Sequence, residues 1–227
     1  MRSIRMIVLI APLMSFIFGI AIALAFVATG WFDSLFFPVS DDEWGRFPVP
    51  AKVELLDDGR QLKLLEDFVY LDPRGRAWTA NKDSVVNGAS IPQAFWTITG
   101  GPLEGKYRNA SIVHDEGCVR MTEPSQKVHL MFYEACRCGG VPEYQAKVLY
   151  AAVYHFGPKW RLKQVMEQRT KIGSDGTTEV ITVTQRVPDV ERSTEDPTVV
   201  VRDKLEAYIK GKNPSLTDIE KLNIDSL

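Results

Sequence analysis

Short alternating runs of apolar and polar residues in the first half of the chain predict two antiparallel hairpins. Segments 53–56 and 62–65 flank an Asp-Asp-Gly-Arg stretch, in which Asp-Gly favours a tight hairpin turn. Segments 68–71 and 77–79 flank Asp-Pro-Arg-Gly, a turn in which proline supplies the backbone angle that is required. We therefore expect a β-rich region at the start of the folded domain.

The pattern then changes to a helical period, from Ile91 to about Lys163. In the first long helix one face carries Ala110, Val113, His114, Gly117 and Cys118. In the next helix the matching stripe is His129, Phe132, Tyr133 and Cys136. A connection of about eight residues joins the two helices, so we expect them to pack antiparallel. His114 and His129 then lie at similar heights, each a few residues from the connection.

The last quarter of the chain predicts a strand and a helical extension. Residues 177–186 alternate Thr and Glu with Val and Ile, as a strand does, and a polar linker containing proline follows. A helix is expected near 200–210, and Thr217-x-x-Glu220 resembles a capping box for a short final helix. The whole pattern predicts an α+β fold in which antiparallel hairpins pack on a bundle of at least three helices. We expect a domain at 51–172 and a C-terminal extension at 173–227.

The N-terminus carries an uncharged run from Met6 to Ala28, which is long enough to span a membrane as a helix. Arg2 and Arg5 precede the run and acidic residues follow it, so the positive-inside rule predicts a single-pass anchor with the body exported. We expect a transmembrane signal-anchor at 1–30, a juxtamembrane connector at 31–50 and location at the inner membrane. The alternative is a cleaved signal peptide, since Ala23-Leu24-Ala25 resembles a cleavage site. Either segment exports the rest of the chain.

Charge excludes one class of partner. The chain has 27 Lys and Arg against 29 Asp and Glu, a formal net charge of −2, which is not the footprint of a nucleic-acid-binding protein. A basic stretch lies around Trp160, between Lys159 and Lys171. We interpret it as a solvated helix face, and the alternative is a surface that contacts anionic lipid beside the anchor. The expected partners are therefore the membrane and an envelope substrate or envelope protein.

Imidazole, carboxylate and thiol groups gather in the two central helices. His114 is a candidate general base, because histidine titrates near neutral pH, and His129 on the facing helix could fix its tautomer. The adjacent Asp115 could hold a hard cation such as calcium, which would polarise a carbonyl or phosphoryl oxygen. The catalytic candidates are thus His114, Asp115 and His129.

Two other chemistries use the thiol of the same helix. Cys118 follows His114 by four residues, so both side chains could be ligands of zinc together with His129, although no fourth ligand is identified. The metal-ligand candidates are thus Asp115, His114 and Cys118. Alternatively, Cys118 is a nucleophile that His114 activates.

Several motifs in the centre of the chain resemble one bacterial and phage family. They are EDFVYLDPRGRAW, NGASIP, VHD, GGV and VLYAAVYHFGPKW, which together extend from about Val53 to Lys163. This pattern resembles the family called domain of unknown function 1353, and the resemblance implies a domain and a site but no reaction. The sequence departs from the family pattern at Asn87, Cys118 and His129, where the family usually has Asp, an aromatic residue and Asp.

The His-Asp pair also has a weaker likeness to phospholipase A2-type sites. There, the histidine activates water and the adjacent aspartate holds calcium, and His114 and Asp115 match that pair. The facing Asp of that family is missing, with His129 at best in its place. In place of a glycine-rich calcium loop there is only Gly100-Gly101-Pro102.

The same residues have structural interpretations. A helical histidine beside another helix is commonly a hydrogen-bonded core residue, and Phe95 and Trp96 are most simply core residues as well. The sequence therefore allows two functions. One is a membrane-anchored, metal-assisted hydrolase of lipid or cell-wall material that uses the His-Asp pair. The other is a non-catalytic envelope module that presents a surface to a partner. A cavity at His114 favours the first, and full burial of both imidazoles favours the second.

Overall fold

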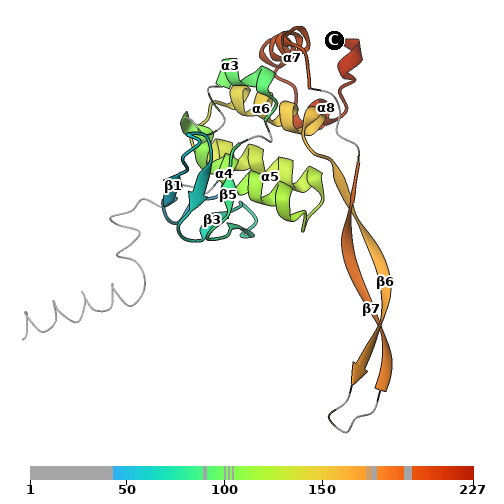
Figure 1. Ribbon diagram of the computed structural model, residues 1–227. Coiled ribbons are helices and arrows are strands. Elements are labelled where there is room, and N and C mark those ends of the chain that lie inside the picture. Colours follow the sequence, from blue (N-terminus) through green and yellow to red (C-terminus); the bar gives the residue numbers. More distant parts are fainter. Residues whose placement is uncertain are drawn as a thin grey trace, which may run out of the picture. The chain divides into compact units, whose positions relative to one another are not determined.

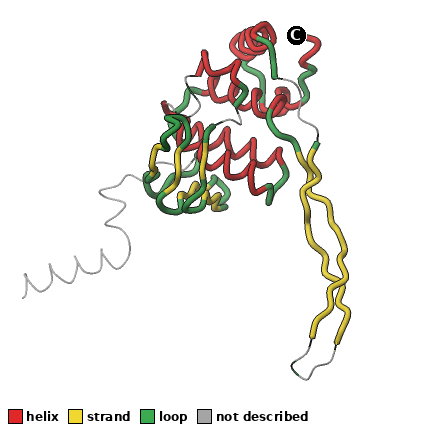
Figure 2. Tube along the Cα trace, viewed as in Figure 1, coloured by secondary structure: helices red, strands yellow, loops and turns green. Residues whose placement is uncertain are grey.

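The computed structural model describes residues 43–88, 91–99, 101, 103, 105–172, 174, 178–191 and 196–227. Figure 1 shows their arrangement, and Figure 2 shows the same trace coloured by secondary structure. The predicted membrane anchor at 6–28 lies outside the described residues. Among the helices that are described, none is both long and apolar enough to cross a membrane.

The described elements give a mixed α+β fold with small antiparallel sheets, as expected. The strands are β1 (Val53–Leu55), β2 (Leu62–Leu64), β3 (Phe68–Leu71), β4 (Ala77–Ala80), β5 (Val85–Val86), β6 (Trp160–Ile172) and β7 (Thr178–Val190). The α-helices are α3 (Trp96–Thr99), α4 (Arg108–Arg120), α5 (Ser125–Cys138), α6 (Glu143–Phe156), α7 (Val199–Lys212) and α8 (Leu216–Glu220). The 3-10 helices are η1 (Gln93–Phe95), η2 (Gly105–Tyr107) and η3 (Ile224–Ser226).

Both predicted hairpins of the β-rich region are confirmed. Strands β1 and β2 pair antiparallel, with Leu55 opposite Leu62, and β5 adds a third strand beside β2. Their turn is closed by Asp58, whose Oδ1 accepts the backbone N–H groups of Arg60 and Gln61, both at 2.9 Å. Strands β3 and β4 form the second hairpin as a separate two-stranded sheet. The local turn chemistry thus determines both connections.

Helices α4, α5 and α6 supply most of the buried residues of the hydrophobic core. The contact between α4 and α5 is close because Gly117 has no side chain: a Cβ atom there would lie 2.8 Å from Cγ1 of Val128. His114, which precedes Gly117, contacts His129, which follows Val128. The two helices therefore run in opposite directions, and the predicted antiparallel packing is confirmed. The core cluster also receives Phe68 and Tyr70 from the second hairpin.

The C-terminal helices are docked onto α6 by three polar contacts. The Nζ atom of Lys147 donates to Oδ1 of Asn213 at 2.7 Å, and the hydroxyl of Tyr150 donates to Oε1 of Glu220 at 2.7 Å. Nε2 of His155 lies 2.8 Å from the carbonyl oxygen of Ile219, which is itself buried. The extension is therefore an integral part of the packed unit Glu43–Leu227.

Three local expectations were wrong. The helical stretch ends at Phe156, before Gly157 and Pro158, and the basic segment that follows is strand β6 rather than a helix face. Strand β6 pairs with β7 along all of its residues, so the expected boundary at 172/173 falls inside a hairpin (Figure 1). The capping box of α8 is formed by Ser215 and Asp218, two residues earlier than predicted.

Candidate functional site

His114 on α4 and His129 on α5 meet inside the helical core. The two residues are 0% and 1% exposed. Nε2 of His114 lies 3.0 Å from Nδ1 of His129, and Nε2 of His129 lies 3.1 Å from the carbonyl oxygen of Pro158. The prediction that the two imidazoles lie within a few ångströms of each other is confirmed.

The contact with Pro158 assigns the tautomers of both rings. A carbonyl oxygen only accepts hydrogen bonds, so His129 carries its proton on Nε2. In a neutral ring Nδ1 is then an acceptor, and His114 donates its own Nε2 proton to it. The two rings form a hydrogen-bond chain that joins α4, α5 and the segment that leads into β6.

Burial lowers the pKa of both imidazoles. The pKa of His114 lies well below its usual value, chiefly through desolvation and secondly through the neighbouring His129. Desolvation lowers the pKa of His129 to about 4; the acceptor at Pro158 opposes this shift, and the charge of Lys159 adds to it. Both rings are therefore neutral at pH 7.

Apolar and sulfur atoms surround the pair. The ring of Phe132 lies 4.6 Å from that of His114, and the ring of Trp160 lies 6.2 Å from that of His129. The Sγ atom of Cys118 is 3.8 Å from Nε2 and 3.9 Å from Nδ1 of His114. The environment of the imidazoles thus resembles a packed core more than a solvated reaction site.

Asp115 is directed to a different part of the fold. Its Oδ2 accepts the backbone N–H groups of Asn87 and Gly88, at 3.2 and 2.5 Å, and the residue is 6% exposed. Gly88 has a φ of +64°, a left-handed conformation that a side chain would disfavour. The Asn-Gly start of the NGASIP motif is thus held against α4 by the aspartate of the VHD motif.

The predicted metal ligands do not converge on one point. Nε2 of His114 is occupied by His129, and Oδ2 of Asp115 is occupied by the loop at Asn87 and Gly88. Within the described parts of the chain, no group of three or more His, Cys, Asp or Glu side chains could hold a metal ion. A calcium or zinc site made of His114, Asp115 and Cys118 does not fit this arrangement.

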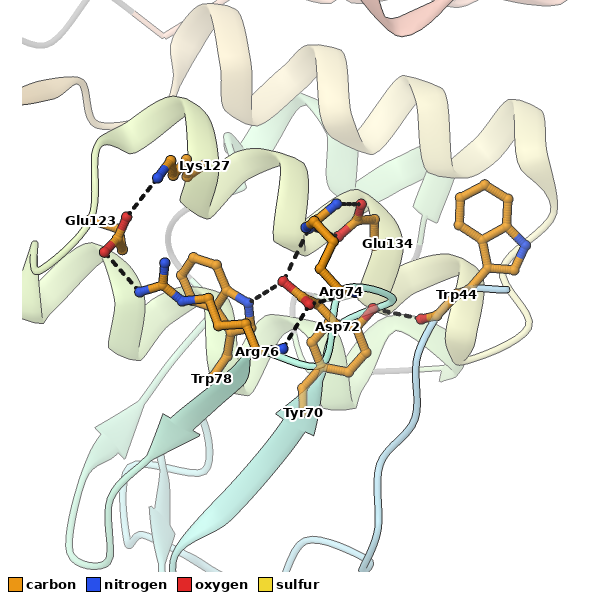
Figure 3. A network of polar contacts seen from close by, with 9 residues as sticks. All are labelled: Trp44, Tyr70, Asp72, Arg74, Arg76, Trp78, Glu123, Lys127 and Glu134. Carbon is orange, nitrogen blue, oxygen red and sulfur yellow. Dashed lines mark hydrogen bonds and ion pairs between the residues drawn. The ribbon is translucent and has the colours of Figure 1, made fainter. Parts of the chain in front are cut away.

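A second polar network fixes the turn between β3 and β4 (Figure 3). Asp72 accepts the backbone N–H groups of Arg74 and Arg76 at 2.9 and 3.0 Å, and its other oxygen accepts Nε1 of Trp78 at 3.1 Å. Burial alone would raise the pKa of Asp72, but these hydrogen bonds and the charge of Arg74 hold it below its usual value. The guanidinium of Arg74 also binds both oxygens of Glu134 on α5, at 2.8 and 2.7 Å. The DPRGRAW motif therefore attaches the second hairpin to α5.

An open cleft of about 800 Å³ lies between the first hairpin and the segment that precedes α4. Its apolar lining includes Val53, Leu55, Leu62, Trp96 and Leu103. Arg60, Arg108, Asn87 and Gln93 supply polar groups. Neither His114, Asp115 nor His129 lines this cleft.

Sequence reasoning missed the cleft. Phe95 and Trp96 were both assigned to the core; Phe95 is buried there as expected, but Trp96 is only half-buried. The walls come from segments that are far apart in the chain, so no local pattern reveals the cleft. The only signal was an apolar Leu55 beside a polar turn.

Comparisons with known proteins agree with the sequence motifs. Residues 62–153 match the family described as "Protein of unknown function (DUF1353)". The chain is 41% identical over 122 residues to the uncharacterized protein y4jT of Sinorhizobium fredii (strain NBRC 101917 / NGR234), an alignment that covers 53% of this chain and 36% of that protein.

The uncharacterized protein y4iH of the same strain is 36% identical over 108 residues, which cover 48% of this chain and 45% of that protein. The matched part thus spans less than half the length of either curated relative, and no solved structure matches the chain. Residues 62–153 are therefore similar to the DUF1353 family of proteins of unknown function, as the NGASIP and VHD motifs indicated.

Proposed function

We propose that this chain is a non-catalytic interaction module of the bacterial cell envelope. In this proposal the His-Asp pair is a structural hub, and the cleft beside the first hairpin is the recognition surface. The observation that carries the proposal is the complete burial of His114 in a hydrogen bond to His129.

A general base must reach the proton that it abstracts, directly or through one water molecule. His114 is 0% exposed, its Nε2 is bonded to His129, and desolvation lowers its pKa. A metal-assisted hydrolase would also need Asp115 to present its carboxylate to a cation, but Oδ2 of Asp115 accepts two backbone N–H groups instead. These contacts favour the structural role over the hydrolase hypothesis.

The hub holds two surface features in place. Through Pro158, the imidazole chain fixes the start of the β6–β7 hairpin, and through Asn87, Asp115 fixes a loop residue that lines the cleft. A recognition module needs such rigid supports behind its surface, since a loose surface loses affinity on ordering.

The envelope location rests on the charge asymmetry around residues 6–28. Reporter fusions placed after Ser40 should be active only in the exported compartment. A cytoplasmic signal from these fusions would contradict the envelope part of the proposal.

The non-catalytic part is tested by an assay of hydrolysis and folding together. The full-length chain and its His114→Gln variant are incubated with phospholipids and with peptidoglycan fragments, with and without Ca²⁺ or Zn²⁺. We expect no hydrolysis above buffer, and a loss of stability in the variant because a fully buried group has been replaced. The matched control is His155→Gln, which changes the half-buried imidazole at the end of α6. A His114→Gln chain that stays fully stable and loses a measurable wild-type hydrolysis would overturn the proposal.

A further inference from the structure

The apolar face of the β1–β2–β5 sheet continues from the core into the cleft. Leu64 and Val86 on this face are fully buried, at 0% and 2% exposure, whereas Leu55 at the other end is 61% exposed. Leu55 lies directly opposite Leu62, and both residues line the cleft. An exposed leucine at the end of a buried stripe leaves apolar surface for a ligand to cover.

Trp96 adds an aromatic ring to the apolar lining of the same cleft. Its indole Nε1 donates to the carbonyl oxygen of Ile91 at 2.9 Å, so the orientation of the ring is fixed before any ligand binds. Leu103 adds a further aliphatic group to the same cleft. The cleft volume of about 800 Å³ falls in the range typical of small-molecule sites, which are mostly apolar with a few polar groups.

The charged groups of the lining favour an anion. Arg60 and Arg108 are both exposed, and neither forms an ion pair with a carboxylate in the described part of the chain. Arg108 uses Nε on the carbonyl oxygen of Leu103 at 2.9 Å, which fixes the position of its guanidinium. Asp58 is the one acidic residue among the described lining residues, and its Oδ1 accepts two backbone N–H groups of the turn. Among the described residues, the lining thus carries two cations against one anion.

We propose that the cleft binds a single-chain anionic amphiphile, with its alkyl chain on Leu55, Leu62 and Trp96 and its phosphate or carboxylate head at Arg60 and Arg108. Guanidinium groups bind phosphate and carboxylate through paired hydrogen bonds, and each buried methylene of the chain adds apolar contact. This inference rests on the proposed function, because it assigns a ligand to the cleft as recognition surface.

The test uses the full-length chain in phosphatidylcholine nanodiscs and a lysophosphatidic acid with a photoreactive diazirine in its acyl chain. After irradiation, peptide mass spectrometry locates the labelled residues, and phosphorus NMR reports whether the ester of the probe is intact. We expect labelling at Leu55, Trp96 or neighbouring lining residues. Neutral monoacylglycerol should compete about tenfold more weakly than unlabelled lysophosphatidic acid.

Variants separate the two parts of the site. Arg60→Gln combined with Arg108→Gln should lower labelling about tenfold, and Leu55→Gln should also lower it. The matched control, Arg169→Gln combined with Arg186→Gln, removes the same charge from the exposed β6–β7 hairpin and should leave labelling unchanged. All of these side chains are exposed, so the variants should keep the wild-type circular dichroism spectrum.

The outcomes test the ligand class and the non-catalytic function separately. Labelling of the cleft with an intact ester supports both the ligand class and the non-catalytic function. Labelling of the cleft with hydrolysis of the ester keeps the ligand class and overturns the non-catalytic function. The ligand class is overturned by any of three results: labelling elsewhere, equal competition by the neutral lipid, or no effect of the arginine variants. The interaction module would then bind a partner of different chemistry.

Discussion

The α4–α5 pair and the β6–β7 hairpin differ in how deeply their side chains are buried. In the helix pair, two imidazoles and a carboxylate are at most 6% exposed, and hydrogen bonds occupy them. In the two strands of the hairpin only Trp160 is buried, and Met166 is 76% exposed. The imidazole and carboxylate side chains of the cluster are therefore among the least accessible of the described residues, which supports the structural role proposed for it.

The largest effect should come from His114→Ala. The substitution removes a fully buried ring and leaves Nδ1 of His129 without its donor, so we expect the free energy of unfolding to fall by about 3–5 kcal/mol. Urea denaturation of the full-length chain measures this, and His155→Ala serves as the less buried control. A loss below about 1 kcal/mol would show that the buried histidine pair contributes no more to stability than an exposed residue of the hairpin.

The buried imidazoles should also make stability depend on pH. Folding lowers the pKa of His129 from about 6.5 to about 4, so between these values the unfolded chain binds more protons than the folded chain. Stability is complete above the unfolded pKa and falls by up to about 3 kcal/mol as the pH decreases through this window.

The pH effect is measured as unfolding free energy at several pH values in the wild type and in His129→Gln. The difference between the two chains isolates the histidine, because paired carboxylates such as Asp72 also lose stability in acid. Equal slopes in both chains would show that His129 is not a buried neutral ring.

An intermediate effect is expected at the polar network of the β3–β4 turn. The Arg74 side chain is 56% exposed, which weakens its ion pairs, but Arg74→Ala leaves a Glu134 side chain that is only 9% exposed without its guanidinium. We expect a loss of about 1 kcal/mol and a similar coupling energy in a double-mutant cycle with Glu134→Gln. A coupling energy near zero would mean that the network does not hold the hairpin on α5.

The smallest effect is expected at Met166→Ser on the hairpin. Because Met166 is 76% exposed, its replacement should change the unfolding free energy by less than about 0.5 kcal/mol. Thermal unfolding at two protein concentrations provides the measurement. A larger loss that grows with concentration would indicate that another molecule covers this face.

The sequence predicted those parts of the fold that depend on local chemistry. Asp58 with Gly59, and Asp72 with Gly75, determine their turns from within a few residues, and both hairpins were found where they were expected. The spacing of His114 and His129 along two antiparallel helices also predicted their contact.

The remaining features depend on contacts between segments that are distant in the chain. The sequence of strand β6 was interpreted as part of the helical stretch, whereas its strand conformation depends on pairing with β7. The burial of the histidine pair requires Trp160 and Phe132 to close over it, and the cleft requires Trp96 to face the first hairpin. Neither feature can be predicted from the spacing of apolar residues within one helix or strand.

The most direct test of the structural hub is the protonation of its rings. The chain has three histidines, so ¹⁵N-histidine labelling of the full-length chain gives few imidazole signals to assign. We predict that His114 and His129 remain neutral, with the proton on Nε2, between about pH 7.5 and pH 5, because both pKa values are lowered by burial. A His114 ring that titrates with a midpoint near 6.5 would contradict the account and return it to the candidates for a general base.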